Sequence, residues 1–236
     1  MKRLLARIAV VAAALSLVCG VLAYTMLRQS LPQLDGDFVT KGVTGDVTIA
    51  RDTAGIPVIT AANRADLAFA TGFVHGQDRF FQMDLTRRNA AGELAELFGE
   101  AALDLDRRHR FHRFRDRANE AVSALSAEHR AVMEAYARGV NEGLASLDAK
   151  PFEYFLIGME PRPWDMADSI LAVFTMYMQL NDERAIRDVR RGLAKQALPD
   201  AVFTWLYPQG TPWDAPLMGE ARAVSAYPDP ATYSLN

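Results

Sequence analysis

The chain has 236 residues, of which 50% are hydrophobic, so it is long enough to bury one substantial core. Its formal net charge of −3 argues against nucleic acid as a partner, and small molecules or another protein are better candidates. Cys19 is the single cysteine, so one copy of the chain cannot form a disulfide.

The N-terminus has the pattern of an export signal. Three basic residues lie within the first seven positions, and an uninterrupted apolar run at 8–27 follows, which at about 20 residues is long enough to span a bilayer. Basic residues ahead of such a run predict a cytoplasmic N-terminus and export of everything after it. Residues 1–28 are therefore expected to be either a signal peptide or a membrane anchor, because Ala23–Tyr24 is a poor cleavage site. The predicted location is the periplasm or the outer face of the membrane.

A short β-rich region follows a linker. Residues 29–45 are interrupted by Gly, Pro and Asp and are expected to form the linker. The remaining region, 46–236, opens with two predicted strands at 47–50 and 58–61, joined by a turn at Gly55–Ile56–Pro57. Two strands alone are only marginally stable, so this hairpin is expected to join a larger sheet. The rest of the chain predicts no such sheet, which points to a missing partner.

Helical periodicity begins after the hairpin. Aromatic and other apolar residues recur at steps of three and four, which predicts one long helix over 65–98 that ends at Gly99. Gly72 and Gly76 lie four residues apart in this helix. They are expected to form a smooth face that another element approaches closely.

Two further helices are predicted. Ser126 is expected to cap one of them, and the other should run over 168–198 before a proline-rich coil. Met176, Gln179 and Leu180 share a face of the second helix, because their spacing is i, i+3 and i+4. They would line an apolar pocket with one polar group at its edge, or belong to an ordinary core.

One helical turn carries His75, Gln77, Asp78 and Arg79, which invites a catalytic interpretation. General acid–base catalysis, however, needs groups that converge from separate elements. The favoured hypothesis is that Asp78 pairs with Arg79 or Arg87 and that His75 belongs to a buried network.

No catalytic residue is predicted in this chain. His109 and His112 have helical spacing, but the arginines around them disfavour a metal ion and indicate a solvated basic face. Ser169 and Ser225 have no activating neighbours in the sequence, and no serine lies in a nucleophile elbow.

Several ordered motifs nevertheless resemble one family. They are Arg51–Asp52, Gly55–Ile56–Pro57, Gly72–Phe73–Val74–His75–Gly76–Gln77–Asp78–Arg79–Phe80–Phe81–Gln82–Met83–Asp84, Arg87–Arg88, Gly92–Glu93–Leu94–Ala95–Glu96–Leu97–Phe98–Gly99, Tyr136–Ala137–Arg138–Gly139–Val140–Asn141 and Pro161–Arg162–Pro163–Trp164. In this order they resemble the small-subunit region of the penicillin acylases, which belong to the N-terminal-nucleophile hydrolase superfamily.

The resemblance implies an α+β fold, mostly helical in this chain with an N-terminal β-hairpin, as part of an αββα core that a second (β) subunit completes. It implies a precursor that is exported and cuts itself. The new N-terminal Ser, Thr or Cys of the β subunit then attacks a linear amide, with its own α-amino group as base. The substrate would be a β-lactam side chain, an acylated homoserine lactone or a similar N-acyl compound.

The resemblance also implies roles for individual residues. Met176, Gln179 and Leu180 resemble the family's pocket-lining positions. Asp188 resembles the position of the α-side carboxylate of a calcium ion shared between the subunits, with Glu183 as the second choice, although calcium needs six to eight oxygens in all.

A different class of protein stays open. The sequence ends at Asn236, near where a spacer and the nucleophile would follow in the family. The chain is therefore expected to be either the α subunit of an amidohydrolase or a truncated, inactive, membrane-tethered remnant that at most binds a partner.

Overall fold

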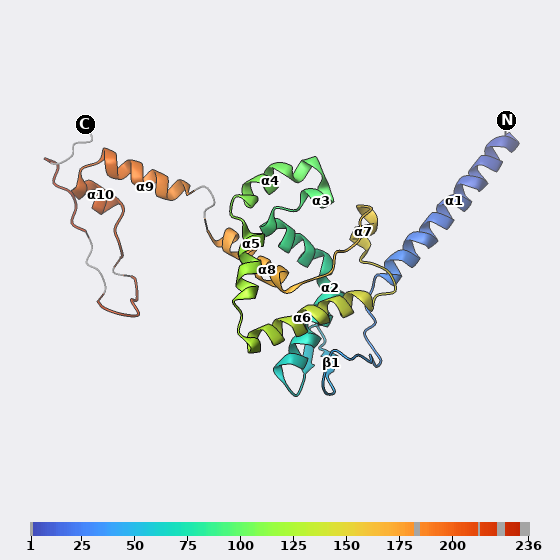
Figure 1. Ribbon diagram of the computed structural model, residues 1–236. Coiled ribbons are helices and arrows are strands. Elements are labelled where there is room, and N and C mark those ends of the chain that lie inside the picture. The colour runs from blue at the N-terminus through green and yellow to red at the C-terminus, as the bar shows by residue number, and fades with distance from the viewer. Residues whose placement is uncertain (1, 182–184, 212, 221–224, 232–236) are drawn as a thin grey trace. The chain divides into compact units, whose positions relative to one another are not determined.

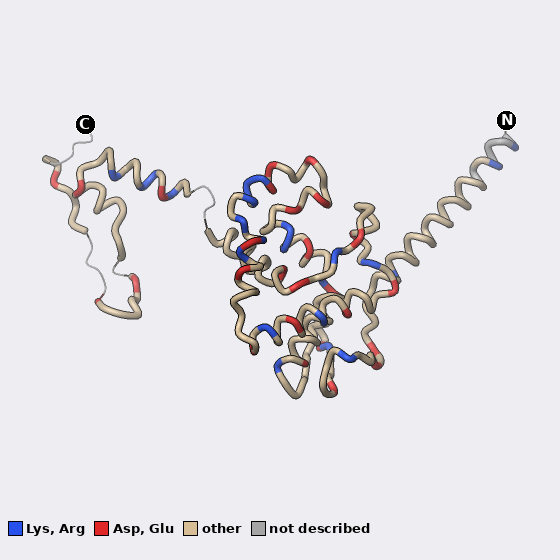
Figure 2. The backbone as a smooth tube through the Cα atoms, viewed as in Figure 1, with Lys and Arg blue, Asp and Glu red and all other residues tan. Residues whose placement is uncertain are grey.

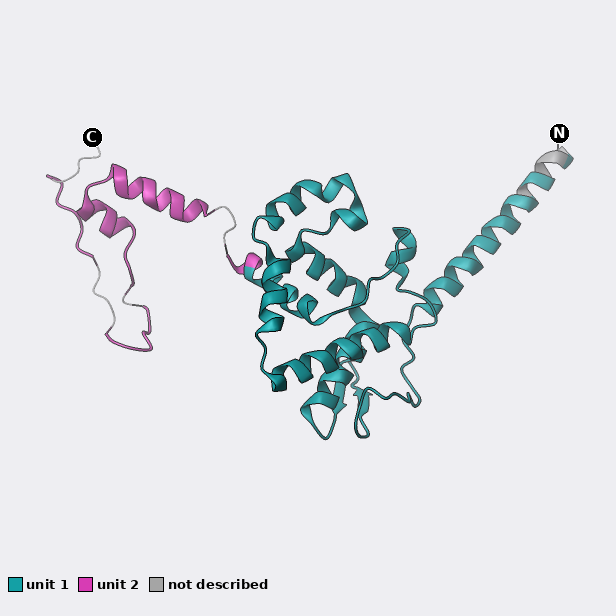
Figure 3. Cartoon of the chain, viewed as in Figure 1, with its two compact units in different colours: residues 1–177 teal, residues 178–236 magenta. Residues whose placement is uncertain are grey.

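The computed structural model describes residues 2–181, 185–211, 213–220 and 225–231 (Figure 1). The chain divides into two compact units, residues 1–177 and 178–236 (Figure 3). The first unit carries most of the helices and the hairpin. The second holds a pair of short helices and a largely irregular tail.

The first unit opens with the apolar helix α1 (Lys2–Gln29). Its stretch Val10–Gln29 is long and apolar enough to cross a membrane, and none of it is buried. Among the described residues, no other helix contains such a stretch. The hairpin comes next, with β1 (Thr48–Arg51) antiparallel to β2 (Pro57–Thr60). The sequence predicted both strands to within one residue. They form a sheet of two strands, and both keep an unpaired edge.

The centre of the first unit is the pair of helices α2 (Arg64–Ala91) and α6 (Ala127–Ala145). Glycines on each helix lie so close to the backbone of the other helix that a Cβ atom at these positions would clash with it. A Cβ on Gly72 would lie 2.2 Å from the Tyr136 carbonyl oxygen, and one on Gly143 would lie 2.0 Å from the Phe73 carbonyl oxygen. The smooth face predicted at Gly72 and Gly76 is therefore the surface on which α6 packs.

Phenylalanines of the predicted α2 stripe form the core around this pair. Phe69 and Phe73 pack with Ala135, and Phe80 packs with Val140 and with aromatic residues of the following segments. As predicted, Ser126 caps α6, and its side chain accepts a hydrogen bond from the His129 backbone N–H.

The long helix predicted over 65–98 is in fact broken. α2 ends at Gly92, whose backbone is left-handed (φ 68°), and the Glu93 N–H bonds back to the Arg88 carbonyl at 2.9 Å. This six-to-one hydrogen bond closes the helix in a Schellman motif. A separate turn, α3 (Ala95–Phe98), then ends at Gly99. Gly92 and Gly99 are both helix-stop residues. The prediction missed the stop at Gly92, because the apolar periodicity continues from α2 into α3.

Four shorter helices complete the first unit: α4 (Glu100–Arg110), α5 (Phe114–Ser123), α7 (Phe152–Leu156) and α8 (Met166–Leu180), the last of which continues past the end of the unit. The predicted helix 168–198 is also wrong as one piece. α8 ends at Leu180, and α9 (Ile186–Ala197) starts from Ala185, a residue with left-handed backbone (φ 48°). The sequence around the break contains Asn and Asp, which are poor helix formers.

The second unit adds a helix where coil was predicted. α10 (Asp200–Leu206) follows Pro199 directly: the Pro199 carbonyl accepts a hydrogen bond from the Phe203 N–H at 3.0 Å, and Asp200 stands in the first turn, where the helix dipole favours negative charge. Phe203 and Tyr207 stack against each other, and Arg191 of α9 lies 6.0 Å from both ring centres.

The segment between α1 and the hairpin has no regular structure but is firmly attached. Phe38 packs on Phe73 with ring centres 4.7 Å apart. The backbone and hydroxyl of Thr44 both donate to the buried carboxylate of Asp66 at 2.9 and 2.8 Å, beside the cap residue Asn63. These bonds fix the path of the chain into the hairpin.

Candidate functional site

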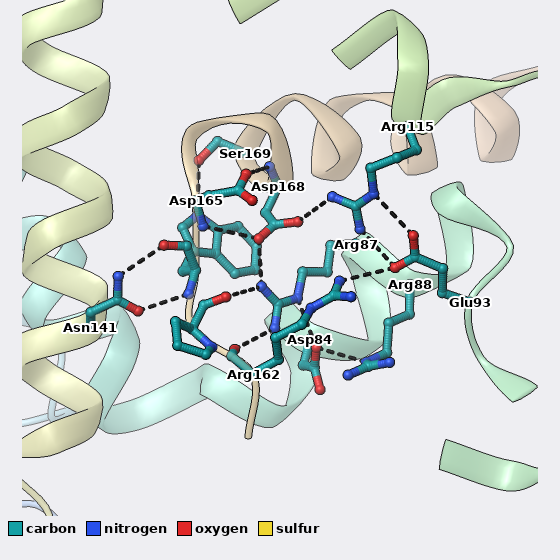
Figure 4. Close-up of polar contacts among 12 residues, drawn as sticks. Asp84, Arg87, Arg88, Glu93, Arg115, Asn141, Arg162, Asp165, Asp168 and Ser169 are labelled. Carbon is teal, nitrogen blue, oxygen red and sulfur yellow. Dashed lines mark hydrogen bonds and ion pairs between the residues drawn. The ribbon is translucent and has the colours of Figure 1, made fainter. Parts of the chain in front are cut away.

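A buried cluster of charges lies at the C-terminal half of α2 (Figure 4). Asp84 and Arg87 are completely buried, and the Arg87 Nε donates to an Asp84 carboxylate oxygen at 2.7 Å. The other Asp84 oxygen accepts from the Tyr154 hydroxyl at 2.7 Å, and Arg88 donates to Asp84 at 2.9 Å. Burial and the neighbouring Asp84 raise the pKa of Tyr154, so it stays a hydrogen-bond donor.

Arg87 links α2 to the loop before α8. Its guanidinium donates to Asp168 at 2.5 Å and to the carbonyls of Arg162 and Pro163 at 2.5 and 2.7 Å. Its central carbon also lies 5.1 Å from the centre of the Trp164 ring. One buried cation thus holds two carboxylates and two backbone carbonyls, which is how a charge remains stable away from water.

A second layer of charges extends the cluster. Arg115 of α5 bonds Asp168 at 2.7 Å and Glu93 at 2.7 Å, and Arg162 also donates to Glu93 at 2.9 Å. Burial acts to raise the pKa of Glu93, but the two arginines outweigh it and hold that pKa below its ordinary value. Burial likewise acts to lower the pKa of Arg115, and the two carboxylates outweigh it and raise that pKa.

The loop that Arg87 holds is fixed on its other side by α6. The Asn141 side chain pairs with the backbone of Trp164, accepting from its N–H at 2.7 Å and donating to its carbonyl at 2.8 Å. Asp165 and Asp168 exchange hydrogen bonds with each other's backbone at the start of α8. Ser169 accepts from the Trp164 indole at 3.0 Å, so its hydroxyl has a structural role.

This cluster holds helices together and does not form an acid–base pair. We call it the clamp; it consists of Asp84, Arg87, Arg88, Glu93, Arg115, Asn141, Tyr154 and Asp168. Its carboxylates face arginines and its tyrosine is a fixed donor, so none of these groups is prepared to move a proton. The clamp joins α2, α5, α6 and α8. Asp84 and Asp168 were not predicted as site residues, because the partners that join them to other elements are distant in the sequence: Tyr154 lies 70 positions from Asp84, and Arg115 and Arg87 lie 53 and 81 positions from Asp168. The separate family motifs around Arg87, Glu93, Asn141 and Trp164 were the available signal, since all of them meet here.

A groove of about 690 Å³ lies beside the clamp and runs over α2, α6 and α8. Most of its lining is apolar, from residues such as Leu67, Met83, Val132, Met133 and Tyr136. His75 stands at its wall, and its Nδ1 lies 2.9 Å from the Tyr136 hydroxyl. Partial desolvation at the groove lowers the pKa of His75 and raises that of Tyr136 to about 12, so both are neutral at ordinary pH. A neutral polar pair in an apolar groove suits a partner surface better than a charged ligand.

The predicted pairing of Asp78 is corrected. Asp78 forms its ion pair with Arg51 of β1 at 2.9 Å, because α2 lies under the hairpin. Arg87 has Asp84 and Asp168 as its partners instead. The prediction that His75 belongs to a buried network is wrong: the residue is exposed at the groove, where its Nδ1 lies 2.9 Å from the Tyr136 hydroxyl.

The predicted solvated basic face is also partly wrong. His109 is buried, with its Nδ1 2.6 Å from the Asn89 carbonyl oxygen, and Arg115 belongs to the clamp. These side chains stabilise the packing of α4 and α5 against α2. Arg107 and Arg113 do remain largely exposed, each paired with an aspartate three residues away.

The structure places the predicted pocket residues together on α8, where Met176, Gln179 and Leu180 are all exposed. Asp188 lies exposed on α9, and Glu183 falls outside the described residues. Across the described ranges, no group of three or more His, Cys, Asp and Glu side chains is placed to hold a metal ion. Asp188 therefore fits a calcium site only as a contributor of one carboxylate. The pocket and calcium assignments stay predictions.

The fold has a counterpart among solved structures. A chain of the thermostable penicillin G acylase from Alcaligenes faecalis matches with a TM-score of 0.58 and 28% identity, covering 75% of this chain and 98% of that one. A mostly helical chain with a small hairpin, matched to this enzyme, has the architecture of the helical part of an N-terminal-nucleophile hydrolase.

Sequence comparison gives the family itself. The model of the penicillin amidase family matches residues 46–225, and the chain belongs to that family. Penicillin acylase 2 proenzyme of Pseudomonas sp. is 43% identical over 61% of this chain, and an acyl-homoserine lactone acylase, QuiP, of Pseudomonas fluorescens is 31% identical over 85%. The aligned parts are 19% and 25% of those two proteins, so the chain spans at most about a quarter of the curated relatives it matches.

Proposed function

We propose that this chain is the α-subunit portion of an amidohydrolase that hydrolyses a linear amide to a carboxylic acid and an amine. One observation carries the proposal. The match covers 98% of a separate chain in a penicillin G acylase structure, whereas it covers only 19% of the proenzyme relative. One structure of the family thus contains a separate chain of about this extent, which supports the proposal that this chain is one of two subunits.

The nucleophile in this proposal is the N-terminal Ser, Thr or Cys of a β subunit. Its hydroxyl or thiol attacks the amide carbonyl, and its α-amino group accepts the proton and passes it to the nitrogen of the leaving amine. Water then hydrolyses the acyl-enzyme and releases the acid. The contribution of this chain is to position the elements that face the β subunit. The clamp around Arg87 fixes the loop at Trp164, and that loop fixes the start of α8.

The substrate class is proposed from the relatives. Their names specify penicillin and acyl-homoserine lactones, both of which contain an N-acyl bond. Met176, Gln179 and Leu180 are proposed to form this chain's part of the acyl pocket. Their exposure on α8 supports this role, since an ordinary core would have buried them.

The β subunit is proposed to cover two surfaces of the first unit. One is the apolar groove along α2 and α6, and the other is the open edge of the hairpin. Unpaired strand edges and large apolar patches are the features that soluble proteins normally cover. A sheet extended by the β subunit would satisfy the free backbone groups of the hairpin.

Calcium is proposed as a shared ion, with Asp188 as one ligand and the other oxygens from the β subunit. The two-chain protein should then melt at a higher temperature with calcium than without it, and Asp188→Asn should reduce that difference. An equal calcium effect in both proteins would remove Asp188 from the site.

Export with retention at the membrane is proposed from α1. Its charged residues lie near its ends (Figure 2), and none of its apolar stretch Val10–Gln29 is buried. The part of the chain after α1 would then lie on the outer side of the membrane.

The first test is made on native material. The protein is purified from its source, and the intact mass and N-terminal sequence of every chain present are determined. A stoichiometric second chain that begins with Ser, Thr or Cys is the expected result, together with amine release from N-acyl substrates. This chain without a second one would contradict the proposal and support the membrane-tethered remnant.

A further inference from the structure

The end of α1 is attached to the body of the first unit. The Gln29 carbonyl accepts a hydrogen bond from the Ala149 N–H at 3.1 Å, and the Ser30 hydroxyl donates to the Lys150 carbonyl at 2.8 Å. Gln29 is also the last residue of the stretch that is long and apolar enough to span a membrane. Residues 149–150 therefore lie where that stretch would leave the bilayer.

The short helix α7 starts two residues further on, and its orientation is fixed. Tyr154 points inward, fully buried, with its hydroxyl bonded to Asp84 of the clamp. The two ends of the segment that contains α7 are joined by Lys150, whose ammonium donates to the Met159 carbonyl at 2.8 Å and to Glu160 at 2.5 Å. These bonds hold α7 to the body of the unit, from which it projects beside the end of α1 (Figure 1).

The outer face of α7 is apolar. Phe152 and Leu156 are four residues apart, so they share one helical face, and they are 42% and 78% exposed. Leu31 and Leu34, just after α1, are exposed as well. Large apolar side chains next to a membrane-spanning helix gain free energy by entering the boundary between headgroups and acyl chains, at a depth of about 5–10 Å.

We propose that α7 is a membrane-contacting element, in which Phe152 and Leu156 insert into the outer leaflet beside α1 and fix the orientation of the first unit on the lipid surface. The occupant is a lipid surface because this face is continuous, through the bonds at Gln29 and Ser30, with a helix that has the length and hydropathy of a membrane span. The inference depends on the proposed anchoring role of α1.

The test uses the single native cysteine. The full chain is reconstituted in phosphatidylcholine vesicles whose acyl chains carry a doxyl quencher near the headgroup, and a small fluorescent probe is attached at one cysteine. Native Cys19 reports on α1. In a Cys19→Ser background, Leu156→Cys reports on α7, and Phe111→Cys is the matched control, because Phe111 is an 85% exposed apolar residue at the end of α4.

Quenching at positions 19 and 156, but not at 111, is the expected result. If position 19 is quenched and position 156 is quenched no more than position 111, α7 does not contact lipid, although α1 is anchored. If position 19 itself is not quenched, the anchor fails and the inference about α7 fails with it. A probe at position 156 that responds only after a β subunit is added would assign α7 to a protein interface and overturn the proposal.

Discussion

At the scale of single residues, the main feature is Arg87, whose buried guanidinium has hydrogen-bond partners on several elements. It is fully buried, and its partners are Asp84, Asp168 and the carbonyls of Arg162 and Pro163. Removing one side of such a cluster leaves uncompensated charge away from water. The cost is then far larger than for an ion pair on the surface.

Arg87→Ala is therefore expected to destabilise the chain by about 3–5 kcal/mol, the usual cost of breaking a buried ion pair. Urea unfolding of the detergent-solubilised chain, followed by tryptophan fluorescence, measures the change. Arg107→Ala is the matched control, because its pair with Asp104 is largely exposed and should be worth at most about 1 kcal/mol. Equal effects of the two substitutions would show that the clamp does not carry the stability assigned to it.

Glu93 gives the clamp a dependence on pH. Its pKa is lowered in the folded chain, so the carboxylate contributes stability above the ordinary glutamate pKa, and this is lost as the pH falls through the lowered value. The difference in unfolding free energy between wild type and Glu93→Gln should therefore shrink as the pH falls through that range. Melting temperatures measured across the range test this. Glu128→Gln, at an exposed site, should show little of the trend, and a pH-independent difference at Glu93 would disprove it.

At the scale of elements, the glycines determine how closely α2 and α6 pack. Two glycines on each helix meet carbonyl oxygens of the other, and backbone cannot move aside as a side chain can. Elsewhere in the chain a helical glycine has open space. Gly192 of α9 has no atom within 4 Å of a built Cβ. The same residue type therefore has opposite consequences in the two places.

Gly143→Ala is expected to destabilise the chain by about 1–3 kcal/mol, because an overpacked contact forces the helices apart. Gly192→Ala should instead stabilise α9 by up to about 1 kcal/mol, since alanine is the better helix former and nothing obstructs it. Circular dichroism during thermal unfolding of both variants compares them. If Gly143→Ala were neutral or stabilising, α2 and α6 would not pack closely enough for a Cβ at position 143 to clash with the Phe73 carbonyl oxygen.

The sequence predicted elements where local signals were strong and failed where two signals competed. The strands, the Ser126 cap and the close-packing role of Gly72 came from short patterns with a direct physical meaning. The break at Gly92 was missed because apolar periodicity continued across it. Contacts between distant positions, such as Arg87 with Asp168, have no local pattern, so the clamp could be inferred only as a set of unexplained motifs.

At the scale of the whole molecule, the first unit carries an apolar groove and an unpaired sheet edge. The groove of about 690 Å³ along α2 and α6 and the open hairpin edge lie on the same unit. Surfaces of this kind are usually covered by a partner. Because the two curated relatives named above are several times longer than this chain, the proposed partner is the remainder of such a protein.

Leu67→Glu should therefore weaken assembly with the β subunit and leave the stability of this chain nearly unchanged. Leu67 lies in the groove lining, and its side chain is 42% exposed, so a carboxylate there is solvated in the free chain but buried without a partner in the complex. Co-purification of a tagged chain with the β subunit measures assembly. Leu103→Glu on α4 is the control, because that residue is 37% exposed and lies outside the groove. Equal recovery of the β subunit with both variants would place the subunit interface elsewhere, and loss with the Leu103 variant alone would move it to α4.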